Sequence, residues 1–147
     1  MTYDVALSRM AALCSTGEHC ESDIRRRLQR ADVAEEDIER LVEYLYEEHY
    51  LDTARYCRAY AHDQLRFAHW GRVRIQEALR QKGLPESDIR TALGELPQEE
   101  YRGVLADLLR QKLRTLHDAD DYVRRNKLIR YAAGRGFEMD EIVDEVD

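Results

Sequence analysis

The sequence has few of the residues that form turns. Glycine occurs 7 times and proline twice among 147 residues, about half of their combined usage in average proteins. Because a sandwich or barrel of short strands needs a turn about every 8–12 residues, this scarcity argues against an all-β fold. The chain also lacks an apolar run of about 18 residues, so no membrane span is predicted, and its first residues lack the features of a secretory signal.

Cysteine is scarce as well. The chain has three cysteines, an odd number: Cys14, Cys20 and Cys57. An odd number of cysteines in a chain without an export signal predicts reduced thiols and a cytoplasmic location. The spacing of Cys14 and Cys20 is not a usual zinc pattern, and no second pair completes four ligands, so we expect no metal site. We interpret Cys20 as the N-cap of a helix that begins near Glu21, and Cys57 as a small core residue.

The sequence contains no group of residues typical of an active site. Its five histidines form no triad or zinc-binding helix with carboxylates, and there is no phosphate-binding glycine loop and no nucleophile elbow. We therefore predict a protein that is not an enzyme and that needs no cofactor.

The net charge of −7 is distributed unevenly along the chain. Residues 1–52 carry a net charge of −7, residues 53–97 a net charge of +3, and residues 98–147 a net charge of −3. A protein that binds nucleic acid on its own is more often basic overall. A locally basic middle in an acidic chain fits equally well a protein partner that is itself negative or is assembled on nucleic acid.

Apolar residues recur with a helical period nearly everywhere. In residues 53–68, Ala54 is followed by apolar residues at offsets of 3, 7, 11 and 14, which form one face of a helix. No segment alternates with a period of two for long enough to be a convincing strand. We predict roughly nine helices with short connections, which is an all-α fold.

One apolar spacing occurs three times, at intervals of 51 and 53 residues. The spacing of 4, 5 and 5 residues is found in Ile24, Leu28, Val33 and Ile38, in Ile75, Leu79, Leu84 and Ile89, and in Leu128, Ala132, Phe137 and Ile142. Each set fits a helix, a corner and a second helix, with Asp32, Gly83 or Gly136 in the left-handed conformation before the corner residue. A further helix precedes each set. This predicts three tandem three-helix units, residues 1–50, 51–96 and 97–147, stacked into an elongated, curved array.

Two groups of mainly basic residues are candidates for binding a partner. The first group is Arg66, Trp70, Arg72, Arg74, Arg80 and Lys82, and the second is Arg124, Arg125, Lys127 and Arg130. Arginines beside aromatic residues are typical of an interface, and such a surface could bind DNA or an acidic protein. A stripe of Tyr56, Tyr60 and Phe67 on the preceding helix either extends this surface or packs the second unit against its neighbours.

Several segments resemble the RecX family of regulatory proteins. They are Leu51-Asp52-Thr53-Ala54-Arg55-Tyr56, the stretch from Gly71 to Leu84 that ends in Lys82-Gly83-Leu84, and Arg135-Gly136-Phe137, with Ala6-Leu7-Ser8-Arg9 resembling the start of the family. The sequence departs from the family at Thr53, where a second aspartate is frequent, and at Cys20, where serine is usual. We expect several motif residues to be architectural, and Asp52 to cap the helix that begins at Thr53.

The resemblance implies three tandem three-helix modules, in agreement with the repeats, and it also implies a function. RecX proteins bind the RecA recombinase, lie in the groove of its filament on single-stranded DNA, and inhibit ATP hydrolysis, strand exchange and filament extension. By this route they modulate recombination, DNA repair and the SOS response. We therefore expect a monomeric, cytoplasmic modulator of RecA that binds DNA weakly, if directly at all. The alternative is a helix-turn-helix protein that acts directly on DNA.

Overall fold

The computed structural model describes all 147 residues and is built from helices alone. The α-helices are α1 (Tyr3–Thr16), α2 (Glu21–Arg30), α3 (Glu35–Glu47), α4 (Thr53–Asp63), α5 (Arg72–Gln81), α6 (Glu86–Gly94), α7 (Gln98–Leu113), α8 (Asp121–Gly134) and α9 (Met139–Val146), and a π-helical segment, η1, covers Gln64–Ala68. The prediction of an all-α fold is confirmed. No helix combines the length and the apolar character that crossing a membrane requires.

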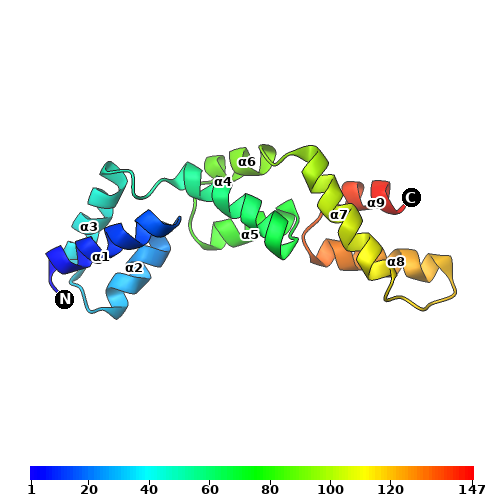
Figure 1. Cartoon of the computed structure of the whole chain (residues 1–147), viewed down its shortest axis with the longest axis horizontal. Helices are drawn as coiled ribbons and strands as arrows, with labels where there is room; N and C mark the ends of the chain where they lie inside the picture. The colour runs from blue at the N-terminus through cyan, green and yellow to red at the C-terminus, as the bar shows by residue number, and fades with distance from the viewer.

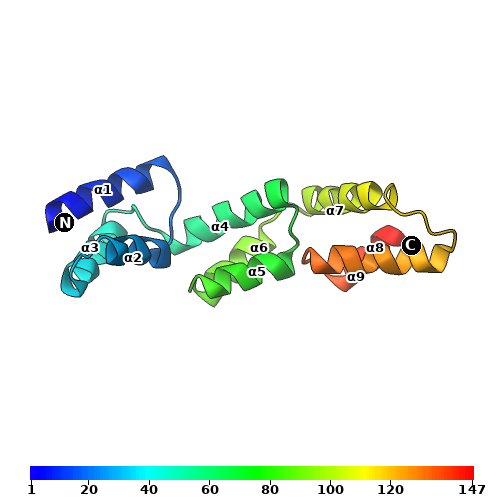
Figure 2. The ribbon, with the colours of Figure 1, turned by 90° about the horizontal axis from the view of Figure 1, so that it is seen from below.

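The helices form three groups that follow one another along an elongated, gently curved molecule, with the two termini at opposite ends (Figure 1). We call α1–α3 the first unit, α4–α6 the second unit and α7–α9 the third unit. Seen from below, α1, α4 and α7 lie along one side of the molecule, and α2, α5 and α8 lie along the other (Figure 2). The tandem three-helix arrangement is confirmed, whereas the unit boundaries at residues 50 and 96 stay a prediction.

The three apolar sets that repeat in the sequence form the centre of each unit. All twelve of their side chains are buried. Residues four apart on a helix face the same side, so the first two members of each set cover one stripe of α2, α5 or α8. Burial of one such aliphatic side chain contributes about 1.5–3 kcal/mol, and the repeat is therefore the main source of stability in each unit.

The corner between the second and third helix of each unit has the same backbone geometry in all three copies. Asp32, Gly83 and Gly136 have φ values of 58°, 84° and 95°. The amide of the residue that follows each of them donates to a carbonyl five residues earlier: Val33 to Leu28 at 3.1 Å, Leu84 to Leu79 at 3.2 Å and Phe137 to Ala132 at 3.2 Å. The predicted left-handed helix ends are confirmed, and Asp32 adopts a conformation that costs a residue with a side chain more than it costs glycine.

The buried hydrophobic residues form two separate clusters rather than three. Nine of them, from Ala6 to Leu51, lie within the first unit and the connection that follows it. The other twenty run continuously through the second and third units and include Cys20 of the first unit. The second and third units therefore share one core, while the first unit has its own.

The cysteines are buried or partly buried. Cys57 is fully buried in the core of the second unit, as predicted. Cys20 does occupy the N-cap position of α2, but its thiol accepts no capping hydrogen bond and instead lies 3.2 Å from the Ser22 hydroxyl, in the shared core. The expected capping role of its side chain is therefore wrong. No group of three or more histidine, cysteine or acidic side chains is placed to hold a metal ion.

The predicted helix over residues 53–68 changes its winding near its end. Asp52 begins it by accepting a hydrogen bond from the Arg55 amide at 2.9 Å, as expected for the N-cap, and the winding changes from α to π at Gln64. Tyr56 and Tyr60 stack at 5.8 Å within the shared core, whereas Phe67 in η1 points into solvent. The predicted aromatic stripe is thus divided, because the wider π turn moves Phe67 out of line with the two tyrosines.

Candidate partner-binding site

The N-terminus of α5 is joined to the third unit by three successive backbone amides. The first amides of a helix have no partner within the helix, and Gly71 has no side chain with which to cap them. The Gly71 amide donates to Arg135 O at 2.8 Å, the Arg72 amide to the Tyr101 hydroxyl at 3.0 Å, and the Val73 amide to Gly136 O at 2.9 Å. We call this contact between the second and third units the joint.

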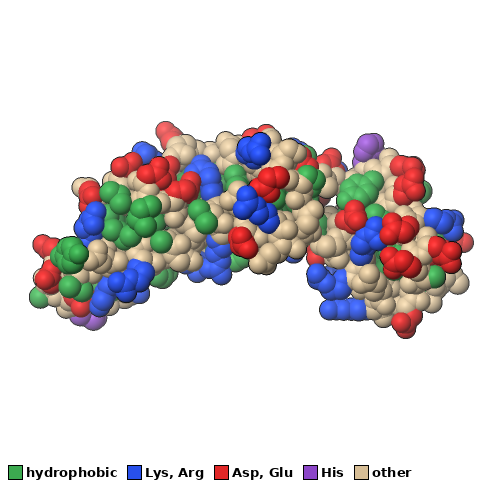
Figure 3. All heavy atoms as spheres, turned by 180° about the vertical axis from the view of Figure 1, so that it is seen from behind, with side chains coloured by type: hydrophobic (Ala, Val, Ile, Leu, Met, Phe, Trp, Pro, Cys, Tyr) green, Lys and Arg blue, Asp and Glu red, His purple; other side chains and the backbone are tan.

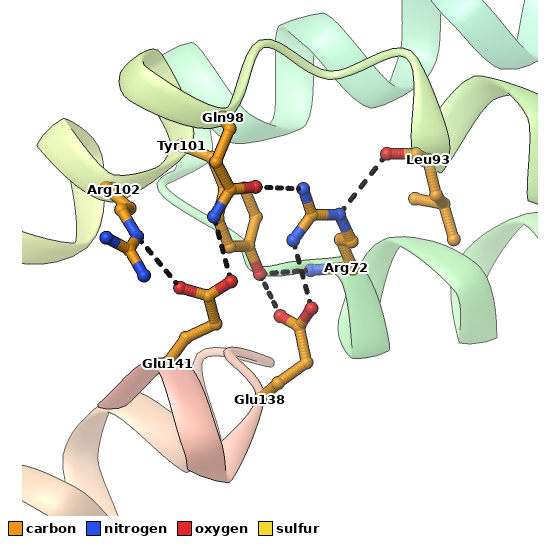
Figure 4. A network of polar contacts seen from close by, with 7 residues as sticks. All are labelled: Arg72, Leu93, Gln98, Tyr101, Arg102, Glu138 and Glu141. Atoms are coloured by element: carbon orange, nitrogen blue, oxygen red, sulfur yellow. Dashed lines mark hydrogen bonds and ion pairs between the residues drawn. The ribbon is translucent and has the colours of Figure 1, made fainter. Parts of the chain in front are cut away.

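The side chain of Arg72 lies inside the joint (Figure 4). Its guanidinium donates to Leu93 O at 3.2 Å, to Gln98 Oε1 at 3.1 Å and to Glu138 Oε2 at 3.0 Å. It also lies 3.9 Å from the centre of the Tyr101 ring, and only 19% of the side chain is exposed. Arg72 is therefore a weaker candidate for binding a partner than the sequence suggested, because its hydrogen-bonding capacity is used within the molecule.

Tyr101 connects the N-terminus of α5 with Glu138, the residue before α9. Its hydroxyl accepts from the Arg72 amide and donates to a carboxylate oxygen of Glu138. Burial raises the pKa of Tyr101, and the hydrogen bond to Glu138 raises it further. The raised pKa favours the protonated hydroxyl, which is the form that can donate to Glu138. Glu141 adds bonds to Gln98 at 2.9 Å and to Arg102 at 3.3 Å at the edge of the network (Figure 4).

The last three motif residues complete the joint. The Arg135 side chain donates to Ala68 O at the end of η1. Gly136 forms the corner, and the buried Phe137 ring packs against Tyr101 with the ring centres 5.2 Å apart. The contacts of these three residues lie within the molecule, so an architectural role remains the prediction for them.

A second contact connects the first and second units. Arg55 forms an ion pair with Glu18 at 2.6 Å and donates to Tyr50 O at 3.2 Å, and Lys82 lies 3.8 Å from Asp23. Tyr56 is buried beside Cys20 in the shared core. The motif residues Arg55, Tyr56 and Lys82 thus hold the first unit against the second.

The N-terminus of α8, in the third unit, is capped differently from that of α5. Asp120 occupies the N-cap, and its Oδ1 accepts hydrogen bonds from the amides of Tyr122 at 2.8 Å and Val123 at 3.4 Å. This helix therefore satisfies its own first amides, whereas α5 relies on the next unit.

Most of the other predicted binding cations are paired with carboxylates of the same chain. The pairs are Arg66 with Glu100, Arg80 with Glu86, Arg124 with Asp121, Arg125 with Asp147 and Lys127 with Asp118. Hydrogen bonds from the paired cation lower the pKa values of Glu86, Glu100, Asp118 and Asp147, so these carboxylates remain charged. A neutralised cation presents little net charge to a partner, and these residues are weaker candidates than the sequence suggested.

Two predicted cations remain exposed and without an ion pair. Arg74 lies 4.3 Å from the centre of the Trp70 ring, which places an arginine and a partly exposed aromatic side by side on the second unit. Arg130 on α8 is the other.

Basic and acidic side chains are interspersed over the rear face of the molecule, without one large basic patch (Figure 3). On this face, binding of an anionic partner would therefore depend on small local groups.

Arg130 belongs to a shallow hollow on the third unit, which we call the basic hollow. It has a volume of about 390 Å³ and is lined by Lys112, Leu116, Lys127, Arg130 and Tyr131. The Lys112 ammonium lies 4.8 Å from the centre of the Tyr131 ring, and no carboxylate lines the hollow. Sequence reasoning placed Lys112 in a basic segment but did not include Tyr131 among the candidates, because the two residues come from different helices and meet only when α7 packs on α8.

Comparison with known proteins identifies relatives of the chain over most of its length. Residues 52–93 match the family profile described as the second three-helix domain of RecX, and residues 99–144 match the third. The regulatory protein RecX of Pseudomonas fluorescens is 34% identical over 139 residues, which are 94% of this chain and 88% of the relative. That of Vibrio parahaemolyticus is 31% identical over 130 residues, which are 88% of this chain and 82% of the relative.

Two crystal structures resemble the whole array. One, of a regulatory protein RecX, has a TM-score of 0.87 and 26% identity, and the match covers 97% of this chain and 70% of that one. The other, RecX from Lactobacillus salivarius, has a TM-score of 0.85 over 98% of this chain and 94% of that one, and at 17% identity it supports the fold alone.

Proposed function

The chain belongs to the RecX family of regulatory proteins, and from this we propose that it binds the filament of the RecA recombinase on single-stranded DNA. There it inhibits ATP hydrolysis, strand exchange and filament extension. The relatives are named regulatory proteins rather than enzymes. We further propose that it acts in the cytoplasm as a monomer.

The mechanism that we propose is a wedge in the groove of the filament. The three units repeat the same helix arrangement along an elongated, curved molecule (Figures 1 and 2), so each can meet an equivalent surface on successive protomers of a helical partner. Each unit alone would bind weakly, and linkage raises the effective concentration of the second and third contacts. A bound array would oppose the movements between protomers that accompany ATP turnover.

Two groups of residues support an anionic contact surface in this complex. They are the pair of Trp70 and Arg74 on the second unit and the basic hollow on the third. Both contain cations without a carboxylate partner in the chain, and both contain an aromatic ring. Such groups can pair with acidic side chains of a protein or with phosphates of the DNA inside the filament.

The charge at the helix starts argues against the alternative of a helix-turn-helix reader of DNA. Such a reader places the first residues of its recognition helix against the base edges. The helices that follow the corners, α3, α6 and α9, all have acidic residues in the first turn, among them Glu36, Asp88 and Asp140. Carboxylates at these positions stabilise the helix but repel the phosphates on both sides of a DNA groove.

The ATPase activity of RecA on single-stranded DNA tests this proposal. We expect the wild-type protein to lower the rate, and the double variant Arg74→Glu, Arg130→Glu to need an at least tenfold higher concentration for the same inhibition at low salt. The difference should shrink as salt rises, because screening weakens contacts between exposed charges. Arg90→Glu, which changes an exposed arginine without an ion pair on α6, is the matched control. Absence of inhibition by the wild type, with steep salt-dependent binding to DNA alone, would favour the alternative.

A further inference from the structure

Phe67 is the most exposed large hydrophobic residue of the chain. Of its side chain, 79% is accessible to solvent, whereas the other phenylalanine, Phe137, is buried in the joint. Single apolar residues on a surface are common and carry no meaning by themselves. The backbone that presents Phe67 is what distinguishes it.

Phe67 lies within η1, in a backbone geometry that proteins use sparingly. The segment ends at His69, which has a φ of 57° and a ψ of 45°, and the amides of both His69 and Trp70 donate to Gln64 O. The left-handed residue ends the helix, as Asp32 does in the first unit, whereas π-helical turns are rare and occur preferentially at functional sites. The fold therefore accepts a local cost at the segment that carries its most exposed aromatic residue.

The third unit fixes this segment on both sides of Phe67. Arg66 binds Glu100 of α7 through two nitrogens, at 2.5 and 3.2 Å, and Ala68 O accepts a hydrogen bond from Arg135. The phenylalanine is thus held at the boundary between the second and third units. An aromatic side chain on a fixed backbone has few torsions to lose on binding, as is typical of an interface anchor.

The charges beside Phe67 indicate the kind of partner. Surfaces that stack nucleic-acid bases combine aromatic rings with free cations that hold the phosphates. Here Arg66 is already neutralised by Glu100, and Asp63, exposed one turn earlier, adds a negative charge. These local charges disfavour binding of a phosphate backbone and favour contact with a protein surface.

We propose that Phe67 inserts into an apolar pocket, with a neutral or basic rim, on a protein subunit of the filament. This anchor rests on the proposed function and specifies its contact. It uses a different residue from the cations Arg74 and Arg130, so the two kinds of contact can be removed independently.

The test compares Phe67→Ala with the matched control Tyr122→Ala, which removes the next most exposed large hydrophobic residue, 70% accessible and located on α8. Inhibition of RecA ATPase is titrated with each variant, and binding of a fluorescent single-stranded oligonucleotide is measured without RecA. We expect Phe67→Ala to need an about 10- to 30-fold higher concentration for half-inhibition, Phe67→Leu to lie between it and the wild type, and Tyr122→Ala to match the wild type. Circular dichroism and the melting temperature should be unchanged in all three variants, since both residues are exposed.

The outcomes separate the anchor from the function. If Phe67→Ala inhibits as strongly as a wild type that is itself active, the anchor is overturned and the proposed function stands. If Phe67→Ala weakens oligonucleotide binding by the same factor as inhibition, the residue stacks on a base and the protein pocket is overturned. If the wild type does not inhibit RecA, the anchor is overturned together with the proposed function.

Discussion

The backbones of Gly71 and Gly136 touch across the joint, although the two residues lie in different units. A Cβ atom on Gly71 would overlap the carbonyl group of Gly136, and a Cβ atom on Gly136 would lie 2.6 Å from the Arg74 amide nitrogen. This approach brings the first amides of α5 within reach of Arg135 O and Gly136 O. Both motif glycines are therefore required by one contact between units.

We expect Gly71→Ala to lower the free energy of unfolding by about 2–3 kcal/mol, because the added methyl must push two backbone segments apart. Gly103→Ala is the control, since nothing lies within 4 Å of a Cβ at this position in α7. The control should be neutral or more stable by up to about 1 kcal/mol, because alanine favours a helix over glycine. Chemical denaturation measures both, and equal stability of the two variants would contradict the close contact.

Truncation of Arg72 should cost clearly more stability than truncation of Arg74, although the two residues are two positions apart on one helix. We expect Arg72→Ala to cost about 2–3 kcal/mol, since it leaves Glu138 without its cation inside the joint. Arg74→Ala should cost less than about 1 kcal/mol, because it removes only a surface cation–π contact and keeps the Cβ that packs on Gly136. Thermal melts distinguish them, and similar losses would show that Arg72 is not part of the joint.

A mutation in one of the two cores should loosen only the helices that share that core. Leu28→Ala and Leu79→Ala each remove a fully buried side chain and should each cost about 2–5 kcal/mol. Hydrogen exchange should accelerate in α1–α3 for Leu28→Ala, and in α4–α9 together for Leu79→Ala, because the second and third units share one core. Acceleration of α4–α6 alone by Leu79→Ala would contradict the shared core.

Acid should weaken the contact between η1 and α7. The hydrogen bonds from Arg66 lower the pKa of Glu100 below its usual value, so this ion pair stabilises the folded state above the usual pKa and is lost as the pH falls through the lowered one. We expect the wild type to exceed Glu100→Gln in melting temperature from neutral pH down to about pH 5, and the two to converge below it. A difference that persists at pH 2–3 would show that the contact does not depend on the charge of Glu100.

The parts of the fold that depend on local spacing could be predicted from the sequence. The twelve apolar repeat positions required only the helical period and the length of a turn. The left-handed residues at 32, 83 and 136 followed from the position of each corner. These features involve residues that are close in the chain, where a pattern identifies the neighbours directly.

The candidate site was harder to predict because it depends on contacts between units. An arginine beside Trp70 and Gly71 has the composition of a binding surface, and nothing in its own segment indicates that Glu138, 66 residues later, faces Arg72. The same holds for Arg66 and Glu100, and for Lys112 and Tyr131. The π turn that directs Phe67 outward also has no apolar signature, since Leu65 remains buried as it would in an α-helix.

The N-cap of α8 differs from that of α5 in a way that works against a further joint of the same kind. Asp120 occupies the N-cap position that Gly71 has in the second unit. Its carboxylate accepts hydrogen bonds from amides that could otherwise donate to a neighbouring unit, as those of α5 do. A side chain at this position would also obstruct the close backbone contact that the joint requires. Designing a fourth repeat onto this protein would therefore begin with glycine in place of Asp120, followed by a unit that supplies a tyrosine hydroxyl and a glycine corner.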